Sequence, residues 1–281
     1  MKDNLGRDIT YLRISVTDRC NLRCLYCMPA EGIKQVEHSN ILSFDRIVDF
    51  TSVAVSMGIE KVRITGGEPL ERKGVVHLTE MLSAIKGIKE LTMTTNGTLL
   101  AEFATSLKKA GLNRVNISMD TADPVRYREI TRGGDIKALI KGILTARDAG
   151  LEPVKLNCVI NSTHPQYDSD SEQINTILPQ ERDAVSVAEF AQKHGLQVRF
   201  IPLMDLCRGE FGQVIGGDGG NCKICNRLRL TATGILKPCL FSDIGYDINE
   251  LGAEKAICSA LNHKPERGGN NTSGAFYNIG G

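Results

Sequence analysis

The feature that most constrains the fold is a unit of strand, loop, helix and glycine that repeats between residues 12 and 202. Short β-branched runs alternate there with amphipathic stretches, which is typical of a parallel sheet built from βα units. Six strands are expected, at 12–16, 61–65, 90–95, 114–119, 154–160 and 197–202. Helices are expected at 43–58, 75–87, 99–111, 136–150 and 181–195, each ending on a glycine that suits a helix C-terminus.

Six units are too few for a closed eight-stranded barrel, so the predicted fold is α/β, a partial (β/α)6 TIM-like barrel. In such a fold, ligands bind at the carboxyl ends of the strands. Residues 161–180 are rich in Ser, Asp, Asn and Pro and are expected to form an exposed loop. After Asp205 the chain becomes rich in glycine and cysteine without a clear helical period. We therefore expect a barrel domain at 1–205 and a small C-terminal subdomain, organised around metal, at 206–281.

Composition excludes several classes of function. Lys and Arg number 34 against 33 Asp and Glu, so no strong global field attracts nucleic acid or an anionic membrane. The first eight residues are polar and no apolar run approaches a membrane span, which predicts a cytoplasmic protein. Nine cysteines without a secretion signal favour metal or redox chemistry over a disulfide scaffold.

Three of these cysteines, Cys20, Cys24 and Cys27, form a CxxxCxxC pattern in the loop after the first strand. A structural zinc site normally takes four ligands. Three thiolates on a [4Fe-4S] cluster instead leave one iron open. That iron can chelate the amino and carboxylate groups of S-adenosylmethionine (SAM) and deliver an electron to its sulfonium. A zinc site or a redox-active thiol pair is the alternative.

The sequence Gly66-Gly67-Glu68-Pro69 follows the second strand. Glycines after a strand permit a close backbone approach to a ligand, and Glu68 can accept a hydrogen bond from the ammonium of the methionine moiety. Between the last two cysteines of the first group, the ring of Tyr26 either packs in the core or lies against an adenine.

With these residues the chain resembles the radical SAM superfamily, and within it the GTP 3′,8-cyclases of molybdenum cofactor biosynthesis, the MoaA family. The likeness runs from about residue 10 to 160 and resumes at 195–205 and 222–243. The strings that carry it are LRISVTDRCN at 12–21, RITGGEPL at 63–70, TTNG at 94–97, NISMD at 116–120, ITRG at 130–133 and VKLN at 154–157.

The resemblance implies two [4Fe-4S] clusters with SAM as cofactors, and an electron donor such as flavodoxin or ferredoxin. It implies that Tyr26, Gly67, Ser118 and Met204 contact SAM. Ser118 closes the fourth strand and Met204 follows the sixth, so both positions suit this role. Ordinary core packing is the alternative for Met204. Family members are often dimers, which makes a homodimer an expectation as well.

A second group, Cys222, Cys225 and Cys239, has the pattern C-x2-C-x13-C. A zinc knuckle, with His263 as a possible further ligand, is one interpretation. The resemblance instead implies a second [4Fe-4S] cluster whose open iron binds the substrate purine, because residues 226–229 match the family's NRxR string.

Basic residues recur on the predicted strands. Arg227 and Arg229 alternate, so both should point to one face, and two guanidiniums suit a triphosphate. A cation that faces into a barrel is costly unless an anion meets it; independent surface charges are the alternative. The strands bear Arg13, Arg63, Lys155 and Arg199. The resemblance implies that the GTP contacts are Arg13, Arg63, Thr94, Lys155, Arg227 and Arg229. It also implies that the terminal Gly280-Gly281 enters the active site, with an ordinary flexible terminus as the alternative.

The likeness is weaker at the substrate end. Only the short stretch 205–221 joins the sixth strand to the second cysteine group, and Pro202 stands where the family has an acidic residue. Residues 161–180 and 244–275 show no clear likeness.

The leading hypothesis is a radical SAM GTP 3′,8-cyclase, a lyase that abstracts a ribose hydrogen from GTP in the first step of molybdopterin synthesis. One alternative is a radical SAM paralogue acting on another nucleotide or a peptide. Another is a non-catalytic iron–sulfur or zinc protein.

Overall fold

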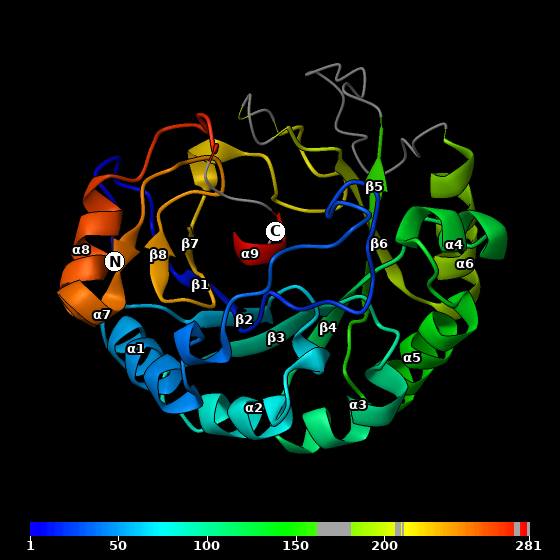
Figure 1. The fold of residues 1–281 in the computed structure, drawn as a ribbon, viewed down its shortest axis with the longest axis horizontal. Coiled ribbons are helices and arrows are strands. Elements are labelled where there is room, and N and C mark those ends of the chain that lie inside the picture. The colour runs from blue at the N-terminus through cyan, green and yellow to red at the C-terminus, as the bar shows by residue number, and fades with distance from the viewer. Residues whose placement is uncertain (162–180, 206–208, 210, 273–275, 280–281) are drawn as a thin grey trace.

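The computed structural model describes residues 1–161, 181–205, 209, 211–272 and 276–279 (Figure 1). Most of the loop expected at 161–180 and the terminal Gly280-Gly281 lie outside the described residues, as does Cys207.

The six strands predicted from the sequence are confirmed, with ends that agree within one residue. They are β1 (Tyr11–Ser15), β2 (Lys61–Thr65), β3 (Glu90–Thr95), β4 (Arg114–Ser118), β5 (Lys155–Ile160) and β6 (Gln197–Pro202). Each pairs in parallel with the next in sequence. The sheet curves without closing, so the predicted α/β class and partial barrel are confirmed (Figure 1).

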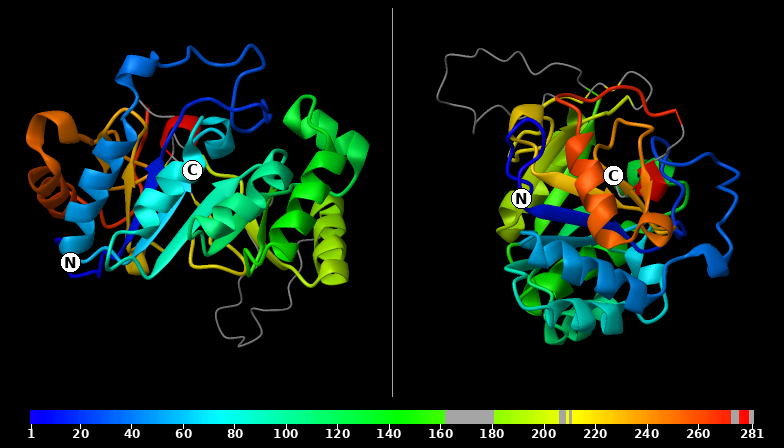
Figure 2. Two further views of the ribbon diagram at one scale, coloured as in Figure 1. Left: turned by 90° about the horizontal axis from the view of Figure 1, so that it is seen from below. Right: turned by 90° about the vertical axis from the view of Figure 1, so that its left-hand side faces the viewer.

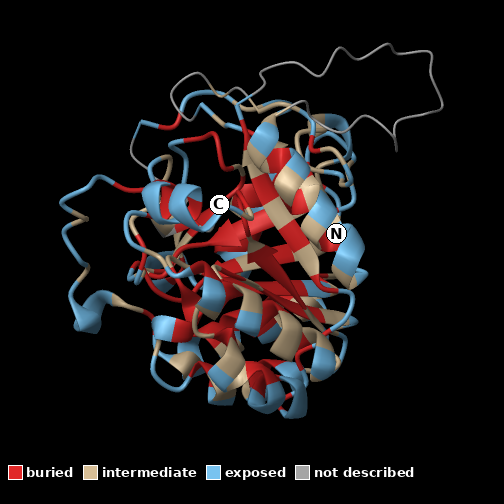
Figure 3. Ribbon diagram, turned by 90° about the vertical axis from the view of Figure 1, so that its right-hand side faces the viewer, coloured by how far each residue is buried: buried red, intermediate tan, exposed pale blue. Residues whose placement is uncertain are grey.

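Five helices cover the outside of this sheet as expected: α1 (Phe44–Ser56), α2 (Val75–Ser83), α3 (Leu100–Lys109), α5 (Ile136–Asp148) and α6 (Arg182–His194). The side chain of Ser43 caps α1 by accepting from the backbone N–H of Arg46. Gly195 ends α6 with a φ of 67°, in the left-handed region that glycine tolerates. Figure 3 shows the exposed residues of the helices on the side away from the buried sheet.

A further helix, α4 (Pro124–Thr131), was not predicted. The side chain of Asp123 caps it by accepting from the N–H of Arg126, and Pro124 occupies its first position. The helix is short, and only Tyr127, Ile130 and Thr131 are buried in it.

The C-terminal region continues the barrel sheet. Its strand β7 (Arg227–Leu230) runs parallel to β1, and β8 (Ile235–Lys237) and β9 (Tyr246–Asp247) follow in antiparallel pairing. Helices α7 (Ile248–Leu251), α8 (Ala253–Asn262) and α9 (Phe276–Ile279) complete the described chain. The expectation of no clear helical period in this region was wrong, because the buried residues of α8, Ala256, Ile257, Ala260 and Leu261, recur at helical spacing.

Buried residues of this region, including Leu228, Leu236 and Ile257, belong to the same hydrophobic core as the barrel. The division into domains at residue 205 stays a prediction. No helix within the described residues combines the length and the apolar composition needed to cross a bilayer.

Figure 1 looks along the barrel, with α9 inside the arc of strands. In both views of Figure 2, α9 and the loop between β1 and α1 stand at the same end of the barrel. This loop carries the first cysteine group.

Candidate active site

A cavity of about 180 Å³ lies at the carboxyl ends of the barrel strands, and Cys20, Cys24 and Cys27 all line it. The backbone N–H groups of Cys27 and Met28 both donate to the carbonyl of Cys24, at 3.0 Å. This tight turn places the last two cysteines on the same side of the loop as Cys20. The three thiols predicted to act together therefore share one cavity.

Helix α4 holds the cysteine loop in place. The N–H of Leu25 donates to the carbonyl of Ile130 at 2.9 Å, and the guanidinium of Arg132 donates to the carbonyl of Met28 at 2.7 Å. Arg132 has a φ of 53°, in the left-handed region, which turns the chain at the end of α4. The ITRG string at 130–133 was noted only as a likeness. In the structure, Ile130 and Arg132 of this string hold the cysteine loop in place through hydrogen bonds.

Burial opposes ionisation of the three thiols of the first cysteine group. Burial raises the pKa of Cys24, and burial together with the charge of Cys20 raises the pKa of Cys27 to about 12. A bound cluster offsets that cost because it takes the thiolate as a ligand. The sulfur of Cys20 accepts from the N–H of Leu22 at 3.4 Å and from the amide of Asn96 at 3.8 Å. These donors favour the thiolate, but burial outweighs them and raises the pKa of Cys20.

In the described part of the chain, no three or more Cys, His, Asp or Glu side chains are arranged to hold a single metal ion.

Gly67 also lines this cavity, and its N–H donates to the carbonyl of Thr17 at 2.8 Å. A Cβ at this position would lie 2.3 Å from the carbonyl oxygen of Arg19. This distance is too short for any side chain, so the position requires glycine. Glycine thus lets the loop after β2 lie against the loop that carries Cys20.

Glu68 occupies a different place from the one expected for a ligand-binding group. It is fully buried and is not among the residues that line the cavity. Its carboxylate accepts from the N–H groups of Leu70 and Asn96 and from the hydroxyl of Thr95, at 3.1, 2.6 and 2.7 Å. Burial raises its pKa to about 7 despite these bonds. Glu68 therefore ties the β2 loop to the end of β3, and its contact with SAM stays a prediction.

The other predicted cofactor contacts, Tyr26, Ser118 and Met204, line the same cavity, as does Thr94. The hydroxyl of Tyr26 donates to Asp120 at 2.8 Å, and the other oxygen of Asp120 accepts from the N–H of Val159, also at 2.8 Å. Asp120, which follows β4, thus links the hydroxyl of Tyr26 to β5. This role of Asp120 was not predicted from the sequence.

A larger cavity, of about 730 Å³, lies inside the barrel toward the amino ends of the strands. Asn157, Ile201 and Met204 line both cavities, so the two are adjacent. The basic residues that line the larger cavity are Lys61, Arg13, Arg63, Arg114, Lys155, Arg199, Arg227 and Arg229, against the acidic Glu90 and Asp218. Of these, Lys61 and Arg114 were missed from the sequence, although both are the first residues of predicted strands.

The register of the sheet places three of these arginines side by side. Arg13 of β1 pairs with Arg63 of β2 on one side and with Arg229 of β7 on the other. The row continues through Thr92 to Arg114 of β4. Paired positions of neighbouring strands point to the same face, so the row faces the cavity that all of these residues line.

This arginine row carries an electrostatic cost. Burial, followed by the charge of Arg229, holds the pKa of Arg13 well below its ordinary value. Burial and the charge of Arg227 lower the pKa of Arg229 to about 10. The guanidinium of Arg63 is aimed by hydrogen bonds of 3.2 Å to the hydroxyls of Thr92 and Thr94. Like charges that lie close together and are partly desolvated destabilise the folded protein unless an anion binds to them.

The second cysteine group lies beside this cavity. Cys222 begins a 3₁₀ turn, η3 (Cys222–Ile224), and its carbonyl accepts from the N–H of Cys225 at 3.2 Å. Burial opposes ionisation of Cys225, but a backbone hydrogen bond and the charges of Lys264, Arg227 and Arg229 outweigh it and lower its pKa. The electrostatic environment of Cys225 is thus opposite to that of Cys24.

Comparison with known proteins decides the family. Residues 14–172 match the model of the radical SAM superfamily. The GTP 3′,8-cyclase of Alkaliphilus oremlandii is 40% identical over 300 residues, which cover 95% of this chain and 94% of that protein. The chain belongs to the GTP 3′,8-cyclase family of radical SAM proteins. The family member from Thermodesulfovibrio yellowstonii is 42% identical over 282 residues, which cover 89% of this chain and 88% of that protein.

Membership of the radical SAM superfamily implies a [4Fe-4S] cluster and SAM. The alignment with the Alkaliphilus cyclase is longer than this chain of 281 residues, so that relative has residues with no counterpart here. This agrees with the shortened connection noted in the sequence.

Solved structures support the same fold. SuiB of Streptococcus suis, bound to S-adenosylmethionine, superposes with a TM-score of 0.58 over 92% of this chain and 65% of that chain, at 15% identity. Methylornithine synthase gives a TM-score of 0.53 over 71% of this chain and 55% of that chain, at 16% identity. At these identities the likeness concerns the fold alone.

Replacing Gly67 by Ala should weaken SAM binding about tenfold, since overpacking costs about 1–3 kcal/mol and must push the two loops apart. Equilibrium dialysis of the reconstituted protein measures this. The control is Gly269→Ala, where a Cβ would lie 3.8 Å from its nearest neighbour and SAM affinity should not change. Equal affinities in the two variants would contradict the close approach as the reason for glycine.

Proposed function

We propose that this protein is a GTP 3′,8-cyclase. The observation that carries the proposal is the arginine row in a cavity adjacent to the cavity of the first cysteine triplet. A triphosphate supplies the negative charge that the row needs, and planar guanidiniums bind phosphate oxygens in pairs. Relatives at about 40% identity over nearly the whole chain bear this name.

In this proposal the small cavity holds SAM. Cys20, Cys24 and Cys27 ligate the first cluster, which with SAM supplies a 5′-deoxyadenosyl radical for abstraction of a ribose hydrogen. The chain's own residues bind and orient the cofactor: Tyr26, Gly67, Ser118 and Met204 as direct contacts, and Glu68 either directly or through the loop that it fixes. Met204 lines both cavities, which suits a residue between cofactor and substrate.

GTP would occupy the larger cavity, with its triphosphate on Arg13, Arg63 and Arg229 and with further contacts from Arg227, Lys155 and Thr94. Its volume of about 730 Å³ falls within the usual range of ligand pockets. The hydroxyl of Thr94 lines the small cavity and accepts from Arg63, so it lies where the two ligands would meet.

We further propose that Cys222, Cys225 and Cys239 hold a second [4Fe-4S] cluster that positions the purine. The neighbours of these cysteines, Ile224, Asn226 and Leu240, line the substrate cavity. The lowered pKa of Cys225 supports ligation as a thiolate.

A flavodoxin or ferredoxin is the proposed electron donor. Leu25, next to Cys24, is 52% exposed, so the first cysteine loop reaches the surface where a donor could approach. The reducing cytoplasm is the proposed location, because it keeps thiols free for iron. The homodimer stays a prediction.

The proposal is tested by anaerobic incubation of the reconstituted enzyme with SAM and a reductant, with and without GTP. GTP should be consumed to a 3′,8-cyclised nucleotide, and 5′-deoxyadenosine should increase with it. Equal 5′-deoxyadenosine with and without GTP, or coupling to another nucleotide or to a peptide, would contradict GTP as the substrate.

Replacing Arg13 by Gln should have opposite effects on stability and on binding. Without nucleotide, the thermal midpoint should rise, because the variant relieves repulsion from Arg63 and Arg229. GTP affinity should fall tenfold or more, since a charged hydrogen bond contributes about 1.5–3 kcal/mol. Calorimetry and a GTP binding titration measure both.

The matched control for this variant is Lys61→Gln, in the same cavity but exposed and ion-paired with Glu90 at 3.7 Å. It should leave GTP affinity within about twofold, as expected for a surface pair. If Arg13→Gln lowers the thermal midpoint and leaves GTP affinity unchanged, the arginine row is structural.

Serine substitutions should separate the two cysteine groups. Cys24→Ser should abolish SAM cleavage, whereas Cys225→Ser should keep uncoupled cleavage to 5′-deoxyadenosine and lose the cyclised product. Serine oxygen is a harder and less readily ionised ligand than thiolate, so each cluster should fail separately. Circular dichroism must first show a native-like fold. Cyclised product at the normal rate from Cys225→Ser would contradict the second cluster's role.

A further inference from the structure

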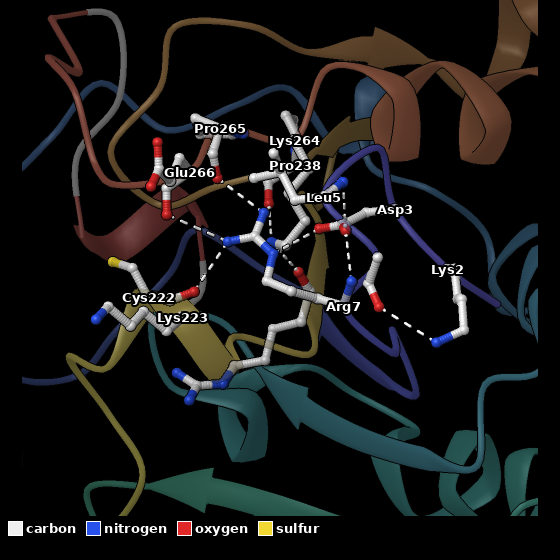
Figure 4. Close-up of polar contacts among 12 residues, drawn as sticks. Lys2, Asp3, Leu5, Arg7, Cys222, Lys223, Pro238, Lys264, Pro265 and Glu266 are labelled. Carbon is white, nitrogen blue, oxygen red and sulfur yellow. Dashed lines mark hydrogen bonds and ion pairs between the residues drawn. The ribbon is translucent and has the colours of Figure 1, made fainter.

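Lys264 lies two residues after α8, beside the second cysteine group. Only 2% of its surface is exposed to solvent. Its ammonium donates to the carbonyl oxygens of Arg227 and Pro238 at 2.7 and 2.6 Å (Figure 4). An ammonium has three protons, and these two carbonyls take two of them. Burial lowers the pKa of this ammonium, and the charges of Cys225 and Cys239 act on it as well and raise that pKa.

These contacts join parts of the chain that carry two different cysteines. Arg227 follows Cys225 by two residues, and Pro238 directly precedes Cys239. Lys264 therefore holds the η3 turn and the end of β8 at a fixed separation.

Arg7 ties the third cysteine to the same place. Its guanidinium donates to the carbonyls of Cys222, Pro265 and Glu266 at 2.9, 2.8 and 3.2 Å (Figure 4). An ion pair of 2.6 Å with Asp3 orients the guanidinium. The segment 264–266 is thus the common anchor of all three cysteine positions.

The charge of Lys264 needs an anion. A buried ammonium is costly unless it is paired. Burial lowers the pKa of Lys264, the charges that raise it are those of Cys225 and Cys239, and Arg7 acts against it. Thiolate sulfurs ligating a cluster would supply negative charge where Lys264 points, whereas neutral thiols are weak acceptors.

We propose that Lys264 is a positioning residue that sets the reduction potential of the second cluster, an inference that rests on the proposed function. It fixes the spacing of the Cys225 and Cys239 segments and places a buried positive charge near their thiols. Net charge, hydrogen bonds to sulfur and solvent exposure determine the potential of an iron–sulfur cluster. A positive charge at this position favours the reduced cluster.

The chain offers a matched control. Lys223 lies between Cys222 and Cys225 in sequence, with the same charge as Lys264, but its side chain is exposed. Solvent screens such a charge, so Lys223 should affect the cluster little.

The test compares K264Q and K223Q with the wild type as reconstituted holoenzymes, by EPR-monitored redox titration of both clusters. In K264Q the midpoint potential of the second cluster should shift to a more negative value. The first cluster of K264Q and both clusters of K223Q should match the wild type. An unchanged second-cluster potential in a folded K264Q protein with both clusters would overturn the proposal.

Iron analysis separates this inference from the proposed function. The wild type should hold about eight irons per chain if two four-iron clusters are present. A content of about four would refute the second cluster itself. If K264Q does not take up the second cluster, K264R is measured. If K264R keeps the second cluster at the wild-type potential, the role of the positive charge is supported. If K264R loses the second cluster, that role is contradicted.

Discussion

The pairing of β7 with β1 is the constraint on which the site depends. It brings residue 229 beside residue 13, across more than two hundred positions of sequence, and it does so in parallel register. The buried pairs Leu12–Leu228 and Ile14–Leu230 fix this register on the core side. A slip of one residue would turn Arg229 away from Arg13 and expose leucine to the cavity. Apolar burial on one face of the strands therefore positions the arginine row on the other.

The same arrangement shows how the fold compensates for buried charge. The arginine row is costly in the free protein, and the apolar core on the opposite side of the sheet offsets that cost. The hydroxyls of Thr92 and Thr94 hold the guanidinium of Arg63 in its extended position toward the cavity. A site prepared in this way binds an anion without having to reorganise, which favours affinity. The cavity proposed for SAM, at the other end of the barrel, is lined by residues without formal charge, and SAM itself would bring a positive sulfonium.

The sequence alone predicted the barrel, because hydrophobic periodicity and the glycines that end helices are local signals. It failed where the signal depended on tertiary contacts. Helix α8 was missed although its buried residues Ala256, Ile257, Ala260 and Leu261 recur at helical spacing. Helix α4, in contrast, has few buried apolar residues and a weak amphipathic pattern. Lys264 shows the same limit of sequence-based prediction. A lysine that follows a helix is expected to be exposed, and only the tertiary partners of its ammonium show that it is buried.

Glu68 is an instructive contrast within the candidate site. Its place in the GGEP string predicted a direct ligand contact, but three donors of the protein already reach its carboxylate. Spacing along the chain identified the right loop and could not say which way the side chain turns. Cys20, Cys24 and Cys27 were predictable as a group because the short spacing itself confines them to one turn.

Part of the short connection between β6 and the second cysteine group lines the larger cavity. Ile215 forms an antiparallel bridge with Phe200 of β6, with hydrogen bonds of 3.0 and 3.1 Å in both directions. Gly217 and Asp218 line the cavity next, and the carbonyl of Asp218 accepts from the guanidinium of Arg227 at 3.0 Å. A few residues thus span from β6 at one end of the sheet to β7 beside β1. The connection, although short, thus contributes Gly217, Asp218 and Gly219 to the lining, and the two glycines let the backbone approach the cavity closely.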